Sequence, residues 1–141
     1  MSGKTIRVLK LTTYDFTTLL AGVVTAEEPV AIDIDISGFR EITFLIRVHA
    51  ANVASGGTTG KITAVVRASA PTNEDPASFF RETISTSVDI VTVNNAPALY
   101  RLIVPANMGS WLTIFLKATQ NSGTSGAALS GTFSIDVSMK E

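Results

Sequence analysis

The chain has 141 residues, 45% of them hydrophobic, which is enough for one domain with a sizeable buried core. Its net charge is −1 and its Lys and Arg residues are scattered, so it offers no basic surface for a nucleic acid. Cysteine is absent, which excludes disulfides, thiolate metal sites and a thiol nucleophile. Charged residues make up only 16%, below the usual quarter or so, and this favours a protein packed against copies or partners over a freely diffusing enzyme.

The N-terminal segment mixes short apolar runs with turn-forming residues. Thr5–Leu11 alternates as a short strand, and residues 12–16 predict a turn. Residues 17–25 fit a helical stripe as well as a strand. The threonines and the interior Gly22 favour a strand or an extended arm.

A connection is expected over residues 26–29, because Pro29 cannot donate to a β-ladder and constrains the residue before it. We therefore predict that residues 1–25 form an N-terminal arm with the first strand. Residues 26–141 should form the main domain.

The stretch Val30–Ala50 contains two runs in which apolar and polar residues alternate. A period of two places one set of side chains on each face of a strand. The pair Ser37-Gly38 separates the runs, so we predict two adjacent antiparallel strands joined by a turn. The residues predicted to share the apolar faces are Ile32, Ile34 and Ile36, and then Ile42, Phe44, Ile46 and Val48.

Five further β-rich runs follow, separated by segments rich in Gly, Ser, Asn and Pro. They cover residues 61–69, 79–93, 99–104, 110–120 and 129–140. The clearest inward faces are Ile62, Ala64, Val66 and Ala68; Leu112, Ile114, Leu116 and Ala118; and Phe133, Ile135, Val137 and Met139, with Ser134, Asp136, Ser138 and Lys140 facing out. About eight strands separated by turn signals predict an all-β fold, a single-domain antiparallel β-sandwich of the jelly-roll kind.

No set of residues in the sequence predicts catalysis. His49 is the only histidine, and a Ser-His-Asp triad or a zinc site would need partners that the chain lacks, so a polar residue at a strand end explains it better. Asp33 and Asp35 could share a face as a calcium or glycosidase carboxylate pair, but a solvated outer face explains them better. The acidic loop at residues 73–75 and the glycines at 56–57 match no metal or phosphate motif. We expect no catalytic residues, no cofactor and no metal site.

Aromatic residues raise a second hypothesis, a carbohydrate-binding β-sandwich module such as a receptor-binding head fibre or tail tip. Sugars stack on exposed aromatic rings, and Trp111 is the strongest candidate for such a platform. The weaker candidates are Tyr14, Tyr100, Phe79 and Phe80, of which the two phenylalanines could equally seal the core.

Three stretches resemble small jelly-roll virion proteins of tailed bacteriophages and prophages. They are DISGFREITFLIRVHA, KITAVVRASAPTNED followed by Phe79-Phe80, and MGSWLTIFLKAT followed by NSGTSG. In that family a strand of the type ISGYREVTV precedes one that ends in an SPTND loop, and a strand of the type GRWLRV lies near the C-terminus. The resemblance covers roughly residues 30–140, with Ser110 where the family has a basic residue.

The resemblance implies a structural role in the virion, as a capsid decoration (cement) protein or another minor virion component. It further implies a homo-oligomer, commonly a trimer, bound to the major capsid protein. No run is long enough to span a membrane and no secretion signal is visible, so we expect assembly in the host cytoplasm without a membrane partner.

The N-terminal arm is apolar enough to dock on a partner. The residues that we predict for this contact are Ile6, Val8, Leu9, Leu11, Tyr14 and Phe16.

Overall fold

The computed structural model describes residues 3–17, 25–53, 60–69, 80–92, 96–105, 111–119 and 128–141, and these form eight β-strands. The strands are β1 (Gly3–Asp15), β2 (Thr25–Asp35), β3 (Glu41–Val53), β4 (Lys61–Ser69), β5 (Phe80–Val91), β6 (Ala98–Val104), β7 (Trp111–Thr119) and β8 (Leu129–Lys140). The predicted loops at residues 70–78 and 121–126 and the segment 18–24 lie outside the described residues, as does most of the loop at 52–60.

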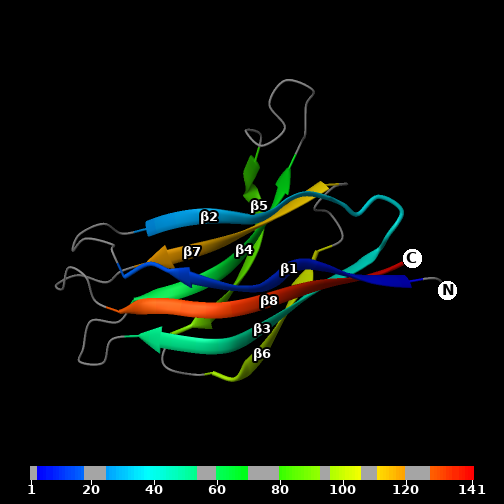
Figure 1. Cartoon of the computed structure of the whole chain (residues 1–141). Helices are drawn as coiled ribbons and strands as arrows, with labels where there is room; N and C mark the ends of the chain where they lie inside the picture. The colour runs from blue at the N-terminus through cyan, green and yellow to red at the C-terminus, as the bar shows by residue number, and fades with distance from the viewer. Residues whose placement is uncertain are drawn as a thin grey trace.

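The first four strands pair with the last four in reverse order. Strand β1 pairs with β8, β2 with β7, β3 with β6 and β4 with β5, all antiparallel. Pairing of β3 with β8 and of β4 with β7 completes two four-stranded sheets, seen as two layers in Figure 1. We call them the β1 sheet (order β1-β8-β3-β6) and the β2 sheet (order β2-β7-β4-β5). This is the jelly-roll form of the β-sandwich, and the predicted fold class is confirmed.

The core lies between the sheets and follows the alternation of the sequence. The inward faces predicted for β3, β4, β7 and β8 are all buried. Phe133 is fully buried, and its ring lies where a Cβ at Gly131 would be, so only glycine fits at position 131. Tyr14 and Phe16 stack with centroids 6.5 Å apart, and Tyr14 lies 6.4 Å from the Phe133 ring.

Strands β2 and β3 are not neighbours, so the predicted hairpin is wrong. β2 pairs with β7, whereas β3 lies between β8 and β6 in the other sheet. The apolar faces of both strands therefore meet across the core instead of lying side by side. The turn between them is fixed by Asp35, whose Oδ1 accepts hydrogen bonds from the backbone N (2.9 Å) and Oγ (2.6 Å) of Ser37, and by Gly38 at φ +84°.

A β-bulge changes the face of β2. Ile34 and Ile36 are buried as predicted, but Ile32 is 45% exposed. Asp33 has φ +53°, and its backbone N donates to Thr113 Oγ1 at 3.1 Å, so two residues of β2 stand opposite one residue of β7. Because the extra residue reverses the alternation, Ile32 turns outward.

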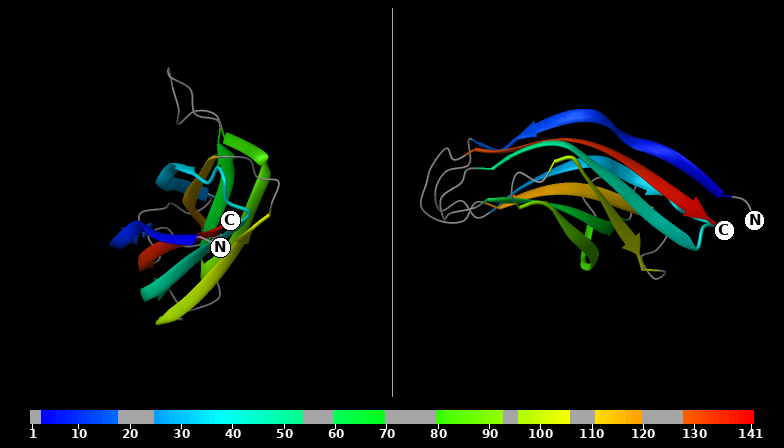
Figure 2. Two further views of the ribbon diagram at one scale, coloured as in Figure 1. Left: turned by 90° about the vertical axis from the view of Figure 1, so that its right-hand side faces the viewer. Right: turned by 90° about the horizontal axis from the view of Figure 1, so that it is seen from below.

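The N-terminal segment belongs to the sandwich. Residues 12–15, predicted as a turn, continue β1, and residues 26–29, predicted as a connection, lie in β2. Gly3 pairs with Lys140, so both ends of the chain lie at one end of the sandwich (Figure 2). The boundary that we expected at residue 25 therefore does not separate β1 from the rest of the fold.

Candidate functional site

The outer face of the β1 sheet is tied together by one buried carboxylate. Asp136 on β8 accepts hydrogen bonds from Arg7 Nε (2.8 Å) and Nη2 (3.2 Å) on β1 and from Arg47 Nη1 (2.6 Å) on β3. The two hydrogen bonds from Arg7, together with the one from Arg47, outweigh desolvation and lower the pKa of Asp136 below its ordinary value. Asp136 does face outward, as predicted, but the two arginines cover it and hold three strands in register.

His49 lies beside this network without forming a triad. Its Nε2 is 2.9 Å from Ser134 Oγ, and among the described residues no carboxylate is hydrogen-bonded to it. In the same part of the chain, no group of three or more His, Cys, Asp or Glu side chains is placed to hold a metal ion. The arrangement supplies a polar contact between β3 and β8.

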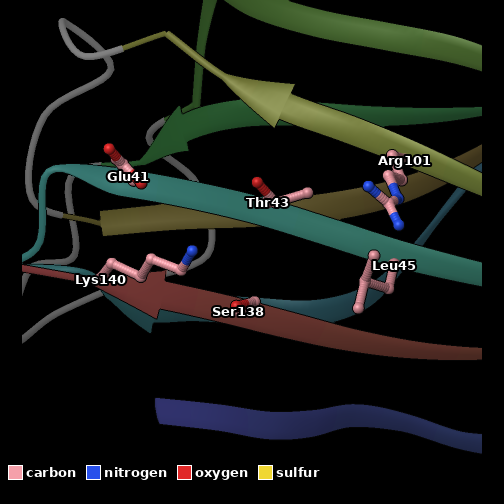
Figure 3. A pocket seen from close by; sticks show the side chains of 6 residues that line it. All are labelled: Glu41, Thr43, Leu45, Arg101, Ser138 and Lys140. Atoms are coloured by element: carbon pink, nitrogen blue, oxygen red, sulfur yellow. The ribbon is translucent and has the colours of Figure 1, made fainter. Parts of the chain in front are cut away.

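A shallow hollow of about 250 Å³ opens on the same face (Figure 3). Its lining side chains come from three neighbouring strands and are Glu41, Thr43 and Leu45 on β3, Arg101 on β6, and Ser138 and Lys140 on β8. Apolar, hydroxyl and charged groups alternate here, and no acid–base pair converges on one point. Such a mixture suits contact with another protein better than chemistry on a small substrate.

Strand β6 adds an apolar stripe beside the hollow. Ile103 is 72% exposed and Leu99 is 55% exposed, although their neighbours Leu102 and Val104 are buried in the core. A second hollow of about 370 Å³ lies next to Leu99 and is bounded by Arg47, His49 and Pro97. We did not predict this stripe, but the run ALYRLIV carries its signal, because apolar residues occupy both faces of one strand.

The outer face of the β2 sheet is organised differently. Arg67 makes a two-pronged ion pair with Glu27 (2.8 Å for each bond), and its guanidinium lies 4.8 Å from the centre of the Phe115 ring. Arg67 and Phe115 are both buried. The hydrogen bonds from Arg67 outweigh desolvation and lower the pKa of Glu27 below its usual range.

A polar hollow of about 450 Å³ extends along β4 on this second face, from Lys61 to Arg67. Thr63 Oγ1 donates to Asp89 at 2.7 Å, and Lys61 Nζ lies 3.5 Å from the same carboxylate. The other hydroxyl and ammonium groups around it belong to Ser85, Ser87, Lys117 and Thr119.

The residues predicted for partner binding divide into two groups. Leu9 and Phe16 are core residues, so they are not available to a partner, and Val8 and Tyr14 are partly buried against the core. Ile6 (38% exposed) and Leu11 (60%) are accessible. The pairing of β1 along β8 makes this part of the predicted arm a strand of the sandwich.

The structure separates the aromatic candidates for a sugar platform. Trp111, partly buried, opens β7 opposite Asp35, at the far end of that strand from Thr119, which lines the polar hollow. Tyr14 and Tyr100 pack against the core, and Phe79 lies outside the described residues. No shared aromatic platform forms among the described residues.

No family model matches this sequence, and no curated protein sequence matches it. Solved structures share its fold, two of them from infectious bursal disease virus. One is the VP2 subviral particle of infectious bursal disease virus, with a TM-score of 0.57, 12% identity and 98% of this chain covered. The other is infectious bursal disease virus Gx strain, with a TM-score of 0.54, 9% identity and the same coverage. This chain spans about a third of the length of those chains (32% and 31%), and at such low identity the likeness shows the β-sandwich fold alone.

The described residues contain no helix that could serve as a membrane span.

Proposed function

We propose that this chain is a virion structural protein of a tailed bacteriophage, a capsid decoration protein that binds the outside of the major capsid lattice and stabilises it. The role is mechanical and involves no catalysis, and the site of action is the virion after assembly in the host cytoplasm. The fold supports the virion role, because nearly the whole chain superposes on a protein of a subviral particle.

The observation that carries the proposal is the apolar stripe of β6 on a sheet face that is otherwise tied down by ion pairs. Ile103 and Leu99 lie on the same outer face of β6 with Arg101 between them, and large aliphatic residues exposed on one face favour a contact surface over a solvent-facing sheet. Burying Ile103 and Leu99 against a partner would contribute about 2 kcal/mol each. Arg101 lies between the two aliphatic residues, and Glu41 and Lys140 line the adjoining hollow, so polar groups accompany the apolar ones as they commonly do in protein contacts.

The Asp136 network makes this face suitable for docking. It fixes β1, β8 and β3 before any partner arrives, so little conformational entropy is lost on binding. A homo-oligomer, such as the expected trimer, would present several copies of the face at once, and weak individual contacts would then add up to firm attachment.

Co-sedimentation with capsids assembled without this protein tests the proposal. The wild-type chain should pellet with the particles in a saturable manner, and Ile103→Asp with Leu99→Asp should abolish pelleting while the circular dichroism spectrum stays unchanged. Ser87→Asp, on the outer face of the β2 sheet, is the matched control and should still bind. If the wild-type chain stays in the supernatant, or if the β6 variant binds as well as the control does, the proposal fails.

A carbohydrate-binding module is the second candidate, and the polar hollow of the β2 sheet favours it. Hydroxyls, two lysines and Asp89 around about 450 Å³ could hydrogen-bond a sugar. Glycan-array binding that is lost in Lys117→Ala, with no binding to particles, would support this function over the decoration role. An array without any signal would remove it.

A further inference from the structure

The side of the sandwich formed by strands β1 and β2 carries opposite charges on its two edges. Each strand is the outermost one of its sheet, and the two approach each other on the same side of the molecule. Strand β1 holds three cations, Lys4, Arg7 and Lys10, and one anion, Asp15; Arg7 is paired with Asp136, so Lys4 and Lys10 are the cations that remain for another copy. The anions of β2 are Glu27, Glu28, Asp33 and Asp35, and this strand has no Lys or Arg; Glu27 is already paired with Arg67 within the chain.

This side also exposes apolar residues on both strands. Ile6 and Leu11 are exposed on β1, and the bulge turns Ile32 of β2 outward. Val8 and Val30 are only partly buried. Apolar residues flanked by opposite charges are the composition of a protein interface.

We propose that copies of this chain associate through this side, with the basic β1 of one copy against the acidic β2 of the next. A rotation about an axis parallel to the strands brings these two edges together and closes a ring of two or three copies. A rotation about an axis perpendicular to the strands would instead place β1 against β1 and β2 against β2. Like charges would then face each other, so the charge pattern selects the first arrangement.

The positions of the charged residues along β1 and β2 are compatible with this contact. Strands β1 and β2 run in opposite directions, with Lys4 at the Asp35 end and Tyr14 at the Glu28 end. Within one chain, hydrogen bonds from Ser37 and then the charge of Lys4 lower the pKa of Asp35. Burial and then the charge of Glu28 raise the pKa of Tyr14. Rotation about an axis parallel to the strands leaves the position of each residue along the strand direction unchanged. Lys10 of one copy therefore faces the half of the neighbouring β2 that contains Glu28.

The contact is made by side chains rather than by a continuous β-ladder. Both strands contain two register shifts, and Pro29 lacks a backbone donor, so neither edge offers an unbroken row of hydrogen-bonding groups. Strands of 11 and 13 residues in two layers give a side of about 40 by 20 Å, on the order of the 800 Å² per partner of a standard interface.

Light scattering on the purified chain, without particles, tests this interface separately from capsid binding. The wild-type mass should be two or three times the monomer mass of 14.9 kDa. Lys10→Glu and Glu28→Lys should each raise the dissociation constant at least about tenfold, because each places like charges across the contact. The chain with both changes should recover the wild-type mass, because the charges are opposite again.

Glu41→Lys, on the outer face of the β1 sheet, is the matched control and should keep the wild-type mass. A monomeric wild-type chain would overturn the interface. So would single variants that assemble normally, or a double variant that stays monomeric although its circular dichroism spectrum is native.

Discussion

The two outer faces of this sandwich are each formed by four antiparallel strands, but they differ in whether large apolar side chains are shielded or exposed. On the β2 sheet, Arg67 covers the Phe115 ring and Glu27 pairs with the guanidinium, so the large apolar group is shielded within the chain. On the β1 sheet, ion pairs hold three strands together, yet Ile103 and Leu99 of β6 stay in water. Because of this difference, we propose the outer face of the β1 sheet, rather than the outer face of the β2 sheet, as the surface that docks on the capsid.

We expect the largest loss of folding stability from a substitution on the outer face of the β2 sheet. Phe115→Ala should lower the free energy of unfolding by about 3 kcal/mol, because it removes a buried ring and leaves a cavity beneath Arg67. Urea denaturation measures this, with Phe115→Leu as a milder control. A loss below about 1 kcal/mol would show that the ring is not shielded, and the contrast between the two faces would collapse.

An intermediate effect is expected at Asp136. Asp136→Asn should lower the free energy of unfolding at neutral pH by about 1–2 kcal/mol, a modest figure because both arginines are half exposed. The pKa of Asp136 is lowered in the folded state, so its contribution is present above the ordinary aspartate pKa and disappears as the pH falls through the lower folded value. Urea titrations from pH 7 to about pH 2 should therefore show a smaller acid-induced loss of stability in the variant. Equal losses in wild type and variant would disprove the assignment.

The smallest effect on stability is expected on the exposed stripe. Ile103→Ser should change the free energy of unfolding by less than about 0.5 kcal/mol, because the side chain is 72% exposed. The same variant should lose most of its binding to particles. Thermal unfolding and co-sedimentation on one preparation compare the two, and a variant that is strongly destabilised would show that Ile103 serves the fold instead.

The sequence predicted the core well where one strand has one apolar face. The inward residues of β4, β7 and β8 follow from a period of two, and all of them are buried. The partner of each strand could not be predicted in this way, because Ile34 and Phe44 look equally apolar whether their strands lie side by side or face each other across the core. Local alternation gives the buried face of a strand but not its sheet.

The remaining differences between the predicted and observed positions of side chains arise at particular residues. The left-handed conformation of Asp33 turns Ile32 outward, and nothing in the alternating run around it indicates a bulge. The predicted role of Ile6 and Leu11 in partner contact stays a prediction, while Leu9 and Phe16 belong to the core. Asp136 was correctly placed on the outer face, but its two arginine partners come from positions 7 and 47, which no local pattern connects.

The central claim is that the β6 side of the β1 sheet docks on a capsid lattice. An electron cryo-microscopy reconstruction of capsids saturated with the chain tests it directly. We expect density on the outer surface of the lattice, with Leu99 and Ile103 against the major capsid protein and the hollow of the β2 sheet in solvent. A reconstruction without added density, or one in which the β6 stripe points away from the lattice, would contradict it.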